Sequence, residues 1–137
     1  MSYLLDTNVI SELRKGERAD ANVNAWFADV AEEELFLSVL TIGEIRRGIE
    51  SVRRRDPDSA AALDRWLAVL SEAHDKRILF VDRAIVEEWG RMNVPDPLPV
   101  VDGLLAATAR VLGLTLVTRN VADIAGTDVD LLNPFAD

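Results

Sequence analysis

The stretch Tyr3-Leu4-Leu5-Asp6 is a short apolar run that stops at an acid. Such a run is typical of a strand that is buried on both faces of a sheet. Similar apolar runs recur at residues 35–38, 78–81 and 114–118, and residues 129–132 form a candidate for a short fifth strand. Segments with helical spacing of apolar residues lie between these runs. This alternation predicts an α/β fold with a parallel sheet that helices cover on both faces.

Helices are expected in six segments of the chain. They lie at residues 7–15, 22–31, 41–52, 59–73, 83–92 and 99–112. The chain has 137 residues, which is the length of one ordinary domain. We therefore expect a single three-layer domain over residues 1–137, with a central parallel sheet of four to five strands flanked by helices.

Charge and residue counts exclude several kinds of function. The chain carries 15 Lys and Arg against 24 Asp and Glu, a net charge of −9. This balance excludes a protein that grips nucleic acid through bulk positive charge, so any such contact needs a local basic patch or bound cations. Cys is absent, which excludes thiolate metal sites. No membrane span or signal peptide is visible, and we expect a cytoplasmic protein that does not contact membranes.

Four acids stand where ligand sites form in a parallel sheet, beyond the carboxyl ends of the strands. They are Asp6 after the first strand, Glu44 early in the third helix, Asp102 early in the last helix and Asp123 after the fourth strand. Each also has a structural interpretation. Asp6 can cap the helix that follows it, and Thr41 with Glu44 matches a capping box. Asp102 can pair with an interior Arg, and Asp123 can stabilise a turn.

Two features favour a functional role for these acids. Gly43 and Gly48 are poor helix residues on either side of Glu44, which suggests that something approaches this helix closely. Residues 100–112 contain only two charged side chains, so their helix should be buried. The carboxylate of Asp102 in such a helix costs several kcal/mol unless it is paired or binds a metal.

Four carboxylates at one edge of a sheet would repel one another strongly unless divalent cations neutralise them. Hard oxygen ligands select Mg²⁺ or Mn²⁺ rather than zinc. The chemistry that such a site supports is hydrolysis of a phosphodiester, in which one metal activates water and a second can stabilise the leaving oxygen.

Ordered blocks of this sequence resemble the PIN-domain nucleases, particularly the VapC-type toxins of type II toxin–antitoxin systems. The blocks are residues 4–10, 38–49, 101–109, 116–124 and 131–134. The resemblance implies a PIN-like α/β domain that acts as an endoribonuclease, requires Mg²⁺ or Mn²⁺ and is inhibited by a cognate antitoxin. It also implies a homodimer and a higher assembly with the antitoxin.

The resemblance assigns roles to the four acids. Asp6 and Asp102 would be the main metal ligands, Glu44 would bind metal directly or through water, and Asp123 would orient water or a second metal. Neighbouring polar side chains would hydrogen-bond to these ligands. They are Thr7, Asn8, Thr118 and Asn120. The chain has Ile124 where the family usually has an aromatic residue, a departure that leaves the acidic set intact.

The expected RNA contacts are basic side chains near the acidic site: Arg46, Arg47 and Arg119. The alternative for the basic run of residues 46–55 is a solvated helix face. An acidic site also suits an antitoxin segment whose Arg or Lys pairs with a carboxylate and displaces metal or substrate.

Two other functions stay open on the sequence. One is a phosphatase or phosphotransferase on a similar sheet, although Asp6-Thr7-Asn8 lacks the second Asp that haloacid-dehalogenase-type enzymes show. The other is a PIN-fold binding module that lost its catalysis, which the presence of all four acids disfavours.

Overall fold

The computed structural model describes residues 1–136 and contains a five-stranded sheet. The strands are β1 (Tyr3–Leu5), β2 (Leu35–Ser38), β3 (Ile78–Leu79), β4 (Thr115–Val117) and β5 (Leu131–Leu132). Their order across the sheet is β3-β2-β1-β4-β5, and every neighbouring pair is parallel. This confirms the predicted parallel sheet, and the carboxyl ends of all the strands lie at one edge.

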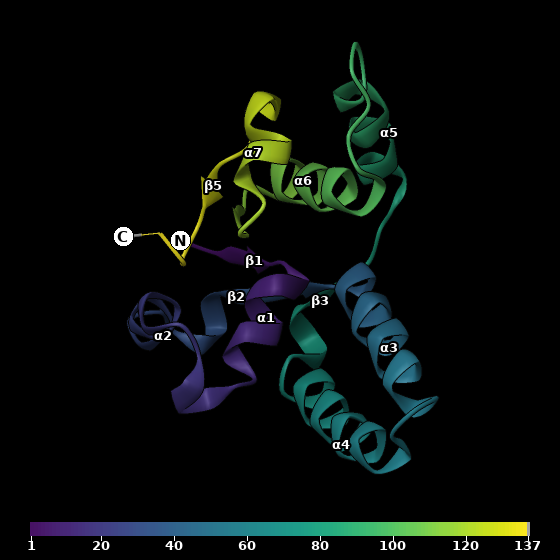
Figure 1. The fold of residues 1–137 in the computed structure, drawn as a ribbon. Helices are drawn as coiled ribbons and strands as arrows, with labels where there is room; N and C mark the ends of the chain where they lie inside the picture. Colours follow the sequence, from purple (N-terminus) through teal and green to yellow (C-terminus); the bar gives the residue numbers. More distant parts are fainter. Residues whose placement is uncertain (137) are drawn as a thin grey trace.

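Seven α-helices surround the sheet in the described part of the chain. They are α1 (Thr7–Leu13), α2 (Ala21–Ala28), α3 (Val39–Arg53), α4 (Pro57–Ala73), α5 (Arg83–Met92), α6 (Val100–Leu112) and α7 (Val121–Ile124). Helices α1 to α4 lie on one side of the sheet and α5 to α7 on the other (Figure 1). The three-layer α/β architecture expected from the sequence is therefore confirmed.

The two faces of the sheet carry separate hydrophobic cores, because successive strand residues point to opposite faces. Leu4 and Leu116 pack with residues of α6 and α7. Leu5 and Val117, the next residues along the same strands, pack with residues of α1, α3 and α4. Unbroken apolar runs are thus required in strands that are covered on both sides.

Side-chain caps set where most of the helices begin. The carboxylates of Asp20, Asp56 and Asp82 accept hydrogen bonds from backbone N–H groups at the starts of α2, α4 and α5. Asp6 does the same at α1, and the Ser38 hydroxyl does so at α3. These contacts satisfy donors that a helix leaves unpaired in its first turn.

Several element boundaries differ from the sequence-based expectation. Strand β3 has two residues and not four, and Phe80, which was expected in it, is 75% exposed. Helix α2 ends at Ala28, whereas the expected helix extended to residue 31. Among residues 1–136, no helix is long and apolar enough to cross a membrane.

Candidate metal-binding and active site

Asp6 lies at the centre of the carboxyl edge of the sheet, between β2 and β4. Its side chain is 5% exposed. One carboxylate oxygen, Oδ1, accepts from the backbone N–H of Thr7 at 2.7 Å, so the predicted capping role is correct. The other oxygen, Oδ2, accepts from the Thr118 hydroxyl at 2.7 Å, across from the end of β4. The Asp6 carboxylate is therefore held by the first residue of α1 and by the residue that follows β4.

A short polar network joins the ends of β1 and β4. The Asn8 amide nitrogen lies 3.4 Å from the Thr118 hydroxyl and 3.5 Å from Asp6 Oδ2. The Asn8 amide oxygen accepts from the backbone N–H of Arg119 at 3.2 Å. The backbone N–H of Asn120 donates to the Thr118 hydroxyl at 3.0 Å. The side chains of Asn8 and Thr118 thus contact Asp6, and the Thr7 hydroxyl contacts Glu44. Asn120, the fourth predicted neighbour, joins the network through its backbone N–H.

Glu44 reaches the same site from α3. Its Oε1 accepts from the Thr7 hydroxyl at 2.6 Å, which ties the second turn of α3 to the first turn of α1. The capping-box interpretation of Glu44 is wrong, because α3 begins at Val39 with Ser38 as its cap. Thr41 lies inside the helix, and Glu44 is too far along it to cap the first turn.

Asp102 lies in the first turn of α6 and is coupled electrostatically to the other three acids. Burial raises the pKa of Asp102 above its ordinary value of 3.8, and the charges of Asp6, Asp123 and Glu44 raise it further. Burial also raises the pKa of Asp6, although the hydrogen bond from Thr118 opposes this effect. The four acids therefore share one region of the protein, including Asp123 from the short helix α7.

No basic side chain neutralises these acids. Within residues 1–136, none of the four forms an ion pair with Lys, Arg or His, so the interior salt bridge considered for Asp102 is not found. Over the same residues, no three Asp, Glu, His or Cys side chains lie close enough to hold one metal ion together. Within residues 1–136, the acids lie near one another but do not enclose a metal ion by themselves. This donor set fits Mg²⁺, which retains several waters and needs only one or two direct carboxylates.

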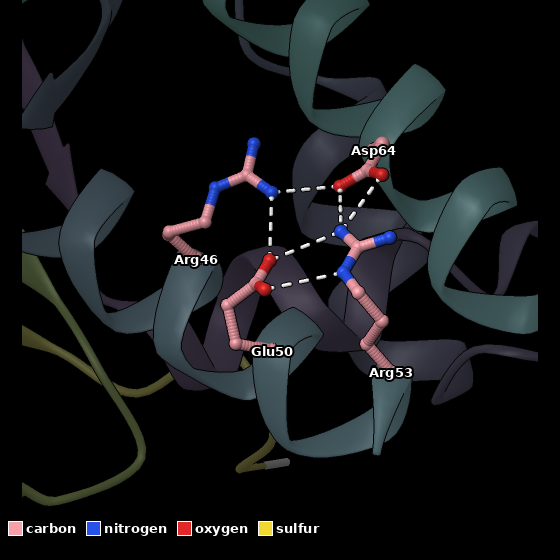
Figure 2. Close-up of polar contacts among 4 residues, drawn as sticks. All are labelled: Arg46, Glu50, Arg53 and Asp64. Atoms are coloured by element: carbon pink, nitrogen blue, oxygen red, sulfur yellow. Dashed lines mark hydrogen bonds and ion pairs between the residues drawn. The ribbon is translucent and has the colours of Figure 1, made fainter. Parts of the chain in front are cut away.

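Arg46 and Arg53, two of the arginines that follow Glu44, form ion pairs with Glu50 and Asp64 (Figure 2). Arg46 donates to Asp64 at 2.7 Å and to Glu50 at 3.3 Å. Arg53 donates to both oxygens of Asp64, at 2.7 and 2.8 Å, and also to Glu50. Arg47 is exposed and forms no ion pair within the described chain. Asp64 was not singled out from the sequence, because it looks there like any acid on an exposed helix face.

Two further expectations concern the surroundings of the site. A Cβ built on Gly43 or Gly48 would meet nothing within 4 Å among residues 1–136, so the close approach expected at α3 is not present in the folded chain. The guanidinium of Arg119 lies 3.6 Å above the ring of Phe135. This contact fixes Arg119 beside the end of β4.

Comparison with known proteins agrees with the fold. The family model described as PIN domain matches residues 3–124. The chain therefore belongs to the PIN-domain family, as the sequence blocks predicted.

Individual relatives extend over part or all of the chain. Ribonuclease VapC14 of Mycobacterium tuberculosis is 44% identical over 66 residues, which are 48% of this chain and 63% of that protein. Toxin FitB of Neisseria gonorrhoeae is 28% identical over 139 aligned positions, covering 98% of this chain and 99% of FitB. The crystal structure of FitAcB from Neisseria gonorrhoeae superposes with a TM-score of 0.90 at 28% identity, over 98% of this chain and 99% of that one.

Proposed function

We propose that this protein is a Mg²⁺- or Mn²⁺-dependent endoribonuclease and the toxin of a type II toxin–antitoxin pair. The observation that carries the proposal is that Asp6 and Glu44 both bond to Thr7 at the carboxyl edge of the sheet, with Asp102 in the first turn of α6, and that none of these acids forms an ion pair within residues 1–136. Membership of the PIN-domain family and the names of the relatives, a ribonuclease and a toxin, support it.

Each acid has a distinct role in this proposal. Asp6 and Asp102 are the direct ligands, because both are restrained by the sheet or by α6. Glu44 binds metal directly or through a water while Thr7 fixes its carboxylate. Asp123, the most exposed of the four, orients water or a second metal. A bound Mg²⁺ would supply the activated water and stabilise the charge that develops on the leaving oxygen.

RNA phosphates are proposed to contact basic side chains beside the acids. Arg47 is free to do so within the described chain, and Arg119 lies at the end of β4. Arg46 would have to exchange its bonds to Asp64 and Glu50 for a phosphate, so it is the weakest of the three proposed contacts. With a net charge of −9, binding depends on these local positive groups and on the cation.

The cognate antitoxin is proposed to insert an Arg or Lys among the four carboxylates. A guanidinium there forms paired, charge-assisted hydrogen bonds with a carboxylate and takes the place of the cation. The relative named as a toxin and the structural similarity to FitAcB support an antitoxin as the partner. We further propose that the toxin is a cytoplasmic homodimer that forms a higher assembly with its antitoxin.

Cleavage of RNA by the chain, purified without any antitoxin, tests the proposal. Cleavage is expected with Mg²⁺ or Mn²⁺ and not with EDTA. Asp6→Asn and Asp102→Asn are each expected to lower the rate by at least about 100-fold, as for other groups that stabilise transition-state charge. Asp75→Asn is a matched control, because Asp75 precedes β3 at the opposite edge of the sheet.

Other outcomes of that experiment identify the alternatives. Metal binding without cleavage indicates a PIN-fold module that has lost its activity. Release of inorganic phosphate from a small ester, with the RNA left intact, indicates a phosphatase. Cleavage that survives EDTA, or that survives both Asn variants, contradicts the proposed nuclease.

A further inference from the structure

Gly103, the residue that follows Asp102, lies against the end of α5. A Cβ at this position would be 3.2 Å from both Cδ1 and Nε1 of Trp89 and 3.3 Å from Cβ of Leu98. Contacts this short are unusual between carbon atoms that meet at about 3.5 to 4.0 Å, so any larger side chain forces a neighbour to move. Gly103 is therefore required by packing and not by backbone conformation.

The neighbours of Gly103 are held in place by Asn93, at the end of α5. The Asn93 amide nitrogen donates to the backbone carbonyl of Trp89 at 2.7 Å. The Asn93 amide oxygen accepts from the backbone N–H of Leu98 at 2.8 Å. One side chain thus fixes both the helix end that carries Trp89 and the loop that carries Leu98.

The indole of Trp89 is only partly buried. Its Nε1 is buried and has no hydrogen-bond partner within residues 1–136, so the ring gains nothing polar in its present place. Buried N–H groups without a partner are uncommon in folded proteins. The first turn of α6 is the other side of the contact, where the Gly103 N–H donates to the Pro99 carbonyl at 2.8 Å.

We propose that Trp89, with Asn93 behind it, is the positioning residue of Asp102. The indole limits how closely the first turn of α6 packs against α5. The separation of these helices in turn determines the position of the Asp102 carboxylate relative to Asp6 and Glu44. This inference rests on the proposed function, because it gives Asp102 the task of binding the divalent cation.

The test measures Mn²⁺ affinity by calorimetry in the full chain, together with RNA cleavage and thermal stability. Gly103→Ala is expected to weaken Mn²⁺ binding about tenfold, the scale of losses seen when a ligand's supporting contacts are disturbed. Adding Trp89→Phe removes Nε1, one of the two nearest atoms, so it relieves part of the contact and is expected to restore part of the affinity. Gly90→Ala is the control, since a Cβ at that helical glycine meets nothing within 4 Å.

Rescue by the second substitution separates positioning from general destabilisation. Wild-type Mn²⁺ affinity in folded Gly103→Ala would overturn the proposal, and so would an affinity that Trp89→Phe does not restore. Should Gly103→Ala not fold, Asn93→Ala decides, with a smaller loss of affinity expected and unchanged affinity overturning the proposal. A chain that binds Mn²⁺ and shows rescue but cleaves no RNA refutes the proposed function alone.

Discussion

Asp6 shows how one residue serves both the fold and the proposed chemistry. Its Oδ1 caps α1, and its Oδ2 is held by Thr118 from the neighbouring strand. From the sequence, helix capping and metal binding were alternative roles for Asp6, because both require an acid at the end of the strand. The structure contains the cap together with the electrostatic coupling to Glu44, so a structural interpretation did not exclude a site.

Asp102→Asn is expected to stabilise the metal-free protein at pH 7. The pKa of Asp102 is raised on folding, so between its ordinary value of 3.8 and the raised value the folded chain binds more protons than the unfolded chain. Stability of the wild type therefore falls as pH rises through that window, and the neutral amide avoids the loss. A small rise in Tm is therefore expected, because solvent screens part of the effect at this partly buried carboxylate.

The pH dependence of that difference is the informative part of the measurement. Melting curves in EDTA should show the advantage of Asp102→Asn at pH 7 and its disappearance near pH 3, where the wild-type carboxyl is protonated. Asp75→Asn should show neither effect. An advantage that persists at pH 3, or that is missing at pH 7, contradicts the electrostatic account of Asp102.

At the scale of elements, helix α3 shows what a local pattern can and cannot predict. The apolar stripe of Ile45 and Ile49 located the helix, and both side chains are buried in the core. Its start was placed two residues late, because Thr41 and Glu44 have the spacing of a capping box. The true cap, Ser38, is the last residue of β2, so strand and helix meet without a loop.

Two substitutions test this assignment of the cap. Ser38→Ala removes the acceptor for the Leu40 N–H and is expected to lower the free energy of unfolding by about 1 kcal/mol. Thr41→Val is expected to be neutral or stabilising, because the Thr41 hydroxyl is buried and has no hydrogen-bond partner in residues 1–136. Urea denaturation measures both, and a larger loss for Thr41→Val than for Ser38→Ala would show that the cap is misassigned.

At the scale of the whole molecule, the strand order β3-β2-β1-β4-β5 explains why distant acids meet. The chain builds outward from β1 on one side and then returns to its other side, so the ends of β1 and β4 flank the point where the order reverses. Ligand sites form at such points in open parallel sheets. Apolar runs and the acids after them were enough to predict this edge.

Contacts between distant helices could not be predicted from the sequence. Arg46 and Arg53 reach Asp64 on the next helix, and Trp89 reaches Gly103 across a loop. These pairings depend on the angle and separation of packed helices, which apolar spacing does not define. Arg46 and Arg53 are consequently less available to RNA than the sequence suggested, because both form ion pairs.

A crystal structure of the chain grown with Mn²⁺ tests the central claim most directly. Anomalous scattering at the manganese edge locates the ion without reference to any assumed ligand. The account predicts manganese among Asp6, Glu44 and Asp102, bound to them directly or through water, and its absence from crystals of Asp102→Asn. Manganese bound only elsewhere, at concentrations that support cleavage, would contradict it.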